Sequence, residues 1–176
     1  MPFKNSIRTF SVLLAISLCG TLSHAASLYK GEKSVGLRGG FTTRNTTETA
    51  GLYFSYRFSD HFRISPKLDY AFRHKDIDAF SIDFDVEIPF SISTSGRTNI
   101  YPIAGLNYSS FSRHLSSNHP DKSDNSSQRE SGLGLSLGAG VEYFATPSLR
   151  LAFEGKGILI RKYSGGWFNL SIGYVF

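Results

Sequence analysis

The sequence predicts an all-β fold: an eight-stranded antiparallel up-and-down β-barrel that spans a membrane after a signal peptide is cleaved. Apolar and polar residues alternate along successive segments, each near the roughly 9–11 residues that a tilted strand needs to cross a bilayer. The composition, with 15 Phe, 9 Tyr and 17 Gly beside a single Met, favours strands. Beyond the N-terminal region no apolar run is long enough for a membrane-spanning helix, which excludes helical spans.

The N-terminal region has the layout of a signal peptide. Lys4 and Arg8 make its start basic, the stretch that follows is uncharged, and small residues precede an expected cut after Ala25. We therefore expect a signal peptide over 1–25 and a single β-barrel domain over 26–176.

Cys19 leaves one alternative open, a lipoprotein whose mature chain begins at this cysteine, although Leu18 stands where such signals prefer a small residue. Cleavage after Ala25 instead removes the only cysteine, which excludes disulfides and cysteine metal sites. The same cut removes Lys4 and Arg8 and leaves 17 basic against 14 acidic residues, a net charge of +3. These charges are scattered, so we expect no nucleic-acid partner.

The first four alternating segments cover 33–43, 50–58, 62–73 and 79–92. Each has one apolar and one polar face, and polar links separate them. Their apolar faces carry, in chain order, Val35, Leu37 and Phe41; Leu52, Phe54, Tyr56 and Phe58; Phe62, Ile64, Leu68, Tyr70 and Phe72; and Phe80, Ile82, Phe84, Val86, Ile88, Phe90 and Ile92.

The last four segments cover 99–109, 132–144, 149–160 and 166–176. The first of these is apolar on both faces in its run 100–103, so the pattern leaves its facing open. The other three alternate clearly. Their apolar faces carry Leu133, Leu135, Leu137, Ala139, Val141 and Tyr143; Leu149, Leu151, Phe153 and Leu159; and Phe168, Leu170, Ile172, Tyr174 and Phe176.

The apolar faces are expected to point outward into lipid. Glycine and serine recur on the polar faces, which suits the crowded interior of a narrow barrel. The links also alternate in length: 59–61, 93–98 and 145–148 are short, whereas the polar stretch 110–131 predicts a long mobile loop. With an even number of strands both termini lie in the periplasm, the short links lie beside them, and the long loop lies outside.

The eight-segment plan, the glycine-rich segment 132–144 and the terminal run Gly173-Tyr174-Val175-Phe176 together resemble the small outer-membrane barrel families around OmpA and OmpX. The resemblance implies a place in the bacterial outer membrane, among its lipid and lipopolysaccharide. Tyr174 and Phe176 resemble the C-terminal signal that the barrel-assembly machinery reads, which implies insertion by that route. The match is to an architecture rather than to an activity.

Charged residues on the polar faces predict an interior closed by ion pairs. Hairpin geometry places Lys67 near Asp85, and Glu142 near Arg150. Because buried charges persist only when paired, we expect a plugged barrel, with a narrow pore as the alternative. The predicted interior network comprises Arg38, Arg57, Arg63, Lys67, Arg73, Arg150 and Lys156 with Asp69, Asp83, Asp85, Glu87, Glu142 and Glu154.

A lipid A-modifying enzyme is a second hypothesis. The run 162–164, Lys-Tyr-Ser, is superficially similar to the His-x-Ser of the PagL-type lipid A deacylases, but the histidine is absent. The remaining histidines, His61, His74, His114 and His119, are all in predicted links, and none stands at catalytic spacing beside a serine on a rigid strand. We therefore expect no catalytic residues.

No cofactor or metal is expected either. His114 and His119 with Asp121 and Asp124 fit no compact metal site, and the paired glycines of 132–140 continue a strand without a following helix to receive a phosphate. The third hypothesis is that loop 110–131 binds a surface ligand, since loops carry much of protein function. The sequence thus favours a structural or adhesion-type surface role.

Overall fold

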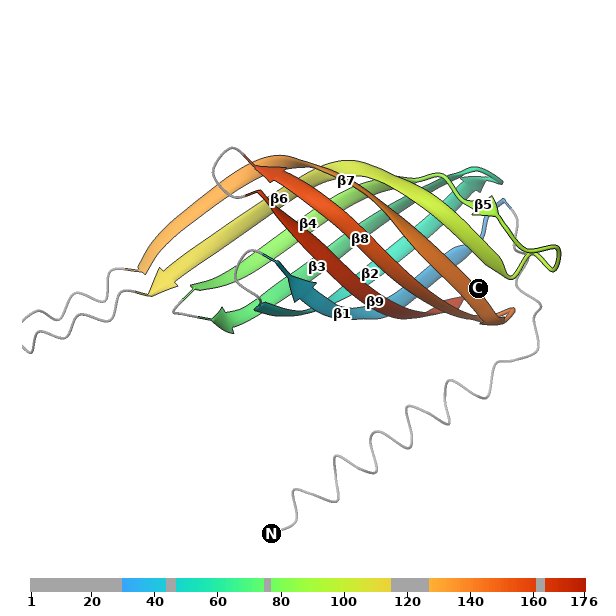
Figure 1. The fold of residues 1–176 in the computed structure, drawn as a ribbon, viewed down its shortest axis with the longest axis horizontal. Helices are drawn as coiled ribbons and strands as arrows, with labels where there is room; N and C mark the ends of the chain where they lie inside the picture. The colour runs from blue at the N-terminus through green and yellow to red at the C-terminus, as the bar shows by residue number, and fades with distance from the viewer. Residues whose placement is uncertain (1–29, 44–46, 75–76, 115–126, 161–163) are drawn as a thin grey trace, which may run out of the picture.

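The computed structural model describes residues 30–43, 47–74, 77–114, 127–160 and 164–176, and within them the chain forms antiparallel strands wrapped into one barrel (Figure 1). Among these residues there is no helix long and apolar enough to cross a membrane. The strands are β1 (Lys33–Thr42), β2 (Thr47–Ser59), β3 (Phe62–His74), β4 (Ile77–Glu87), β5 (Phe90–Ser91), β6 (Thr98–His114), β7 (Ser127–Thr146), β8 (Leu149–Ile160) and β9 (Gly165–Val175).

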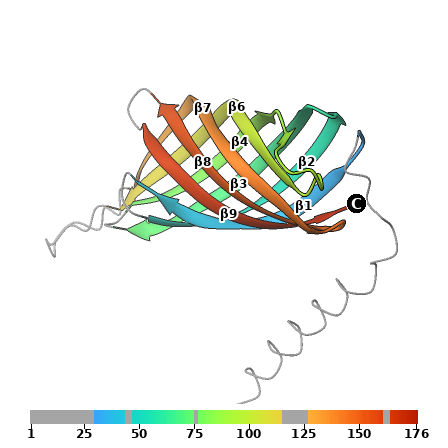
Figure 2. The same cartoon turned by 45° about the vertical axis from the view of Figure 1, so that its right-hand side comes forward.

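The barrel is closed, and it has eight strands because β4 and β5 form a single interrupted strand that pairs with β6. Each strand pairs with the next along the chain, and β1 pairs with β9 to complete the circle (Figure 2). At the seam, Lys33 and Phe176 exchange backbone hydrogen bonds of 3.0 and 2.9 Å. The predicted eight-stranded up-and-down topology is confirmed.

The break between β4 and β5 differs from the uninterrupted segment 79–92 that the sequence predicts. Pro89 has no N–H to donate to the neighbouring strand, so the ladder cannot continue through it. Only a 3.3 Å bond from the Ile88 N–H to the Pro102 carbonyl bridges the gap before pairing resumes at Phe90.

The facing of the strands follows the predicted alternation. Large apolar side chains cover the outside, and Leu37, Phe84 and Leu137, for example, are 60%, 51% and 57% exposed. In β6, whose facing the sequence leaves open, Tyr101 and Ile103 are buried inside while Ile100 points outward.

The loop at 110–131 is shorter than predicted. β6 continues to His114 and β7 begins at Ser127, so these two strands stay paired from Thr98 opposite Tyr143 to His114 opposite Ser127. The prediction depended on hydrophobic alternation, which stops where the outward face becomes polar, at Ser110 on β6 and Ser131 on β7, although the backbone ladder continues. Likewise β2 begins at Thr47 rather than at residue 50.

The two ends of the barrel differ. We call the end that holds Glu32 and Phe176 the terminal end; it also holds the turns at 60–61, 88–97 and 147–148. Gly96 there adopts a φ of 68° and donates its N–H to the Ser93 carbonyl at 2.9 Å, a tight turn that favours glycine. The opposite end, the distal end, carries the links at 43–46, 75–76, 115–126 and 161–164. The predicted signal peptide lies outside the described residues.

Candidate functional site

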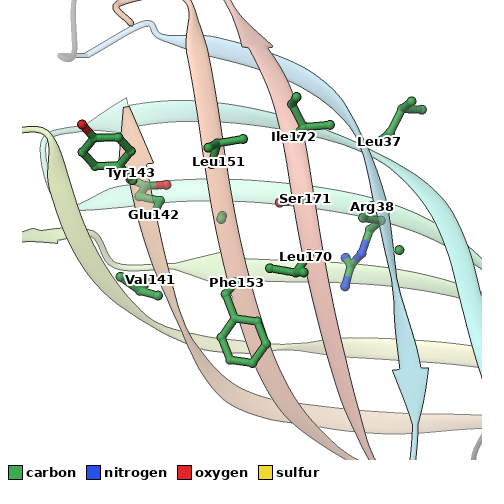
Figure 3. Close-up of a pocket in the computed structure, with 12 residues that line it drawn as sticks. Leu37, Arg38, Val141, Glu142, Tyr143, Leu151, Phe153, Leu170, Ser171 and Ile172 are labelled. Atoms are coloured by element: carbon green, nitrogen blue, oxygen red, sulfur yellow. The ribbon is translucent and has the colours of Figure 1, made fainter. Parts of the chain in front are cut away.

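The outer wall carries a shallow apolar groove with a volume of about 640 Å³ (Figure 3). Outward side chains of β7, β8, β9 and β1 line it, among them Tyr143, Phe153, Leu170 and Leu37. The interior shows the opposite chemistry.

Inside the barrel, thirteen buried charged side chains of the described residues join into one continuous ion-pair network. Every member is at most 5% exposed. The members, called the interior network below, are Glu32, Arg38, Arg57, Arg63, Lys67, Asp69, Asp83, Asp85, Glu87, Glu142, Arg150, Glu154 and Lys156.

Glu142 on β7 is the centre of the network toward the terminal end. Its carboxylate lies 2.8 Å from Arg63 Nη1, 3.0 Å from Arg150 Nε and 3.5 Å from Arg57 Nη2. Asn99 adds a fourth contact, donating from Nδ2 to Oε1 at 2.9 Å. One carboxylate therefore neutralises part of the charge of three guanidinium groups from three strands.

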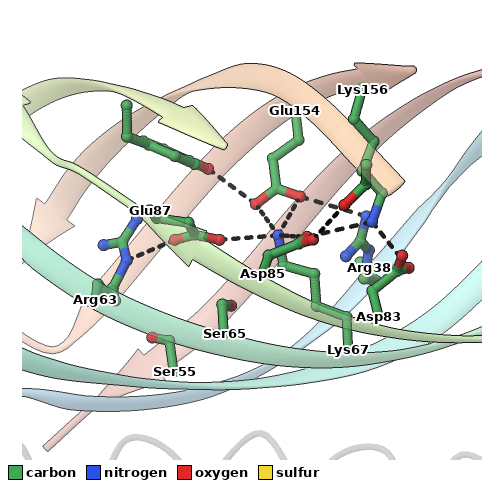
Figure 4. Close-up of polar contacts among 12 residues, drawn as sticks. Arg38, Ser55, Arg63, Ser65, Lys67, Asp83, Asp85, Glu87, Glu154 and Lys156 are labelled. Carbon is green, nitrogen blue, oxygen red and sulfur yellow. Dashed lines mark hydrogen bonds and ion pairs between the residues drawn. The ribbon is translucent and has the colours of Figure 1, made fainter. Parts of the chain in front are cut away.

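Lys67 on β3 is the corresponding centre halfway along the barrel (Figure 4). Its ammonium lies 3.1 Å from Asp85, 2.8 Å from Glu87 and 2.9 Å from Glu154, and an ammonium has three N–H bonds to donate. Glu87 also lies 2.6 Å from Arg63 Nε, so this carboxylate joins the two halves of the network.

Two further basic residues extend the network toward the distal end. Lys156 Nζ lies 2.8 Å from Asp83 and 3.2 Å from Asp85. Arg38 lies 3.2 Å from Asp69 and 3.3 Å from Glu154.

Of the thirteen residues that the sequence assigned to the interior, twelve lie in this network, and the side chain of Arg73 is outside what the structure describes. Both pairs that hairpin geometry suggested, Lys67 with Asp85 and Glu142 with Arg150, are in contact.

Sequence reasoning missed Glu32, which lies 3.8 Å from Arg57 at the terminal end. It precedes the first alternating segment by one residue. Because alternate residues of a strand face the same side, its spacing of two from the inward Ser34 was the signal that could have identified it. Burial raises the pKa of its carboxyl above the usual range, while the Arg57 charge opposes that shift.

Two inward tyrosines, Tyr53 and Tyr101, pack against arginines of the network. The Arg63 guanidinium lies 4.8 Å from the centre of the Tyr101 ring, and that of Arg150 lies 5.2 Å from the Tyr53 ring. The Tyr101 hydroxyl also donates to Glu154 at 3.0 Å. Aromatic faces attract cations most strongly where water is excluded.

Inward glycines make room for these rings. A Cβ on Gly140 would overlap the Tyr101 ring, and a Cβ on Gly36 or Gly173 would overlap Tyr53. The glycines that suggested a narrow interior thus have a definite role, which is to let two aromatic rings approach the backbone of the wall closely.

Gly140→Ala is therefore expected to lower the free energy of unfolding by about 1–3 kcal/mol, the usual cost of overpacking. Gly157→Ala is the matched control, because an outward Cβ there meets only the Leu137 carbonyl, at 3.8 Å. Urea unfolding of both variants in detergent micelles measures the difference, and equal stability of the two would contradict the close packing of Tyr101.

Toward the distal end the interior holds a polar ladder and a small apolar cluster. Asn107 donates to Ser81 at 2.6 Å and to Asp83 at 2.7 Å. Ile158, Ile160 and Trp167 form the cluster, which the sequence analysis did not identify. The two isoleucines follow Lys156 at alternate positions of β8, and this spacing was the signal that they point inward.

The predicted alternatives to a plugged barrel fall mostly outside the described residues, which include neither Lys162 and Tyr163 nor His119, Asp121 and Asp124. Ser164 is described, and its hydroxyl donates to the Ile160 carbonyl at 3.1 Å. Within the described residues no three His, Cys, Asp or Glu side chains are arranged to hold a metal ion.

Comparison with solved structures shows the same fold in other outer-membrane proteins. The N-terminal β-barrel domain of Pseudomonas aeruginosa OprF matches 84% of this chain and 99% of its own, with 15% identity and a TM-score of 0.66. Ail, the attachment invasion locus protein of Yersinia pestis, matches the same shares with 17% identity and a TM-score of 0.59. Neisserial surface protein A matches 86% of this chain and 99% of its own, with 17% identity and a TM-score of 0.57.

No curated protein sequence matches the chain. A family model, however, covers residues 11–176, and it is described as an outer membrane protein β-barrel domain. The alternation of the strands, the apolar outer wall and the charged interior agree with that description. The chain belongs to the outer membrane protein β-barrel domain family.

Proposed function

We propose that this protein is a closed, non-conducting outer-membrane barrel that acts through its distal loops at the cell surface. The observation that carries the proposal is the continuous interior network, because side chains that fill the barrel leave the two ends as the places where a partner from the surrounding water can bind. Apolar side chains fill the interior on both sides of the charged centre. Toward the distal end these are Ile158, Ile160 and Trp167, and toward the terminal end it is Phe144.

The energetics of buried charge support a closed interior. An eight-stranded barrel is only just wide enough for its own side chains. Moving Lys67 or Glu142 aside to open a path would break three ion pairs at once, and a buried charge without a partner is strongly unfavourable. Within its described residues the barrel offers no other partners for the charges that would be left unpaired, so a stable open state is not expected.

Planar bilayer recordings test the closed interior. Purified refolded protein is expected to give no stable, large conductance step, whereas a porin inserted in the same bilayer provides the positive control. A sustained large open state at moderate voltage would overturn the proposal in favour of the narrow-pore alternative.

We also propose the orientation, with the terminal end in the periplasm and the distal end outside. Its support is the length of the links: the turns at 60–61 and 147–148 are short, and the link between His114 and Ser127 is long. Short periplasmic turns and longer extracellular loops are the rule for such barrels.

A protein with a similar structure supports a surface role. Ail, the barrel of similar fold from Yersinia pestis, is the attachment invasion locus protein, and one of its structures is a complex with the heparin analogue sucrose octasulfate. For this chain we infer a comparable class of role, binding of a surface ligand by the loop between β6 and β7.

A tagged loop replacement tests orientation and role together. Residues 115–126 are exchanged for an epitope tag of equal length, which spares Ser127 and Gln128 and so preserves their pairing with His114 and Arg113. Antibody is expected to label intact cells and adhesion to host cells to fall to background. The matched control carries the tag after Ser95, in the terminal end turn, where intact cells should remain unlabelled. Labelling of the control alone would reverse the orientation, and undiminished adhesion would reject the ligand role.

We propose no catalytic role, since the histidine of the deacylase motif is absent from 162–164. Release of acyl chains from lipid A by the purified protein would overturn this.

For insertion we propose that the assembly machinery reads Tyr174 and Phe176. Their stacked rings lie 6.1 Å apart and point outward at the C-terminal end of β9.

A further inference from the structure

The groove on the outer wall lies between two parallel rows of outward residues that run across four neighbouring strands (Figure 3). Each row follows the cross-strand register, so its members lie side by side on β7, β8, β9 and β1. The first row is Tyr143, Leu151, Ile172 and Leu37, and the second is Val141, Phe153, Leu170 and Gly39.

The floor of the groove is backbone. The residues between the two rows, Glu142, Ala152, Ser171 and Arg38, turn their side chains toward the interior and leave only the strand surface exposed to the groove. At about 4.8 Å between neighbouring strands, the rows are roughly 14 Å long. The second row ends in Gly39, which has no side chain, so the groove stays open on β1.

One wall of the groove is stiffened by aromatic stacking. The Phe168 ring lies 6.4 Å from the Phe153 ring and 5.3 Å from the Phe41 ring, with small interplanar angles. Phe153 therefore stands in a stack that crosses from β8 to β1, and it cannot turn into the groove without losing these contacts. A preformed, apolar, elongated hollow is the shape that an unbranched hydrocarbon chain fills.

We propose that this groove is a phospholipid site: it binds one acyl chain, with the headgroup beside Tyr143. The groove is continuous with the apolar belt that faces the outer membrane, so the acyl chains of membrane lipids are in contact with it. Tyr143 lies three residues before the end of β7, where a ring with an apolar body and a polar hydroxyl suits the membrane interface. The bound lipid then belongs to the leaflet on the terminal-end side.

A matched pair of glycine variants tests the site. Gly39 and Gly157 both point outward, and a Cβ at either meets only one carbonyl oxygen, of Thr49 at 3.5 Å or of Leu137 at 3.8 Å. Only Gly39 lines the groove. Gly39→Phe fills the open end of the groove, whereas Gly157→Phe places the same ring on the belt elsewhere.

Native mass spectrometry of protein extracted from membranes and washed in detergent gives the readout. Wild type and Gly157→Phe are expected to retain one phospholipid per chain. The phospholipid occupancy of Gly39→Phe is expected to be at least tenfold lower than that of wild type. Equal retention by all three proteins overturns the proposal, as does a dimer that carries no lipid, since the groove would then hold a second copy. A gel shift between boiled and unboiled samples confirms that each variant is folded.

A second measurement uses the unaltered protein. In vesicles that contain a phospholipid with a diazirine in its acyl chain, cross-links are expected to concentrate on groove residues such as Leu151 and Leu170. An even distribution around the belt overturns the site. Neither readout depends on conductance or adhesion, so failure of this proposal is distinguishable from failure of the proposed function.

Discussion

Replacing Glu142 with alanine is expected to lower the free energy of unfolding by about 3–5 kcal/mol, the cost of breaking a buried ion pair by removing one partner. The loss is large because three guanidinium groups, those of Arg57, Arg63 and Arg150, each lose a carboxylate in a site without access to water. Asn99 loses its acceptor as well. Glu142→Gln keeps the shape and part of the hydrogen bonding, so it should fall between the alanine variant and wild type.

Urea unfolding in micelles measures the effect, and the single tryptophan, Trp167, is buried inside the barrel and reports it by fluorescence. Glu48→Ala is the control, because Glu48 is an exposed glutamate on β2 and its loss should change stability by less than about 0.5 kcal/mol. If Glu142→Ala costs no more than Glu48→Ala, the interior network does not stabilise the barrel.

A double variant separates the loss of attraction from the cost of an unpaired charge. Within the described ion pairs, Arg150 contacts Glu142 alone, so Arg150→Met removes one of the charges that Glu142→Ala leaves behind. The combined variant is expected to be less destabilised than the sum of its parts. Strict additivity would show that the two side chains act independently.

The strands and their facing were predictable because one physical cause controls both. A wall with lipid on one side and a narrow interior on the other imposes a period of two, and the run from Phe80 to Ile92 shows it without exception at the outward positions. Parity then assigns Lys67, Asp85 and Glu142 to the interior with no further information.

The partners of these charges were predictable only between neighbouring strands. Lys67 on β3 meets Glu154 on β8, and Arg63 on β3 meets Glu142 on β7, across the barrel rather than along a hairpin. Such contacts depend on the tilt and stagger of the closed barrel, which a one-dimensional pattern does not contain.

Other features were missed where the pattern carries a different signal or none. The last residues of β6 and the first residues of β7 are polar on the outward face, so periodicity did not reveal that their pairing continues to His114 and Ser127. The run 100–103 is apolar on both faces, and the inward facing of Tyr101 follows from its parity with Asn99 and Asn107 in the same strand.

Phe84→Arg is expected to prevent stable insertion into the membrane. Phe84 is 51% exposed on the outer wall and lies in the middle of the apolar belt of its strand, with Phe80 and Ile82 toward the distal end and Val86 and Ile88 toward the terminal end. An arginine at this depth costs roughly 2–4 kcal/mol in the bilayer, a large part of a typical net stability.

Phe90→Arg is the matched control for depth. Phe90 is similarly exposed, at 47%, but lies on β5 beside the terminal end turn, where the same charge should cost about 0–1 kcal/mol because the guanidinium reaches the interface. The fraction of heat-modifiable, folded protein in the membrane is expected to be near wild type for Phe90→Arg and near zero for Phe84→Arg. Since the two variants introduce the same residue on the same barrel strand, a difference between them measures the depth of the hydrocarbon. Equal assembly of both would show that this face of the wall does not lie in lipid.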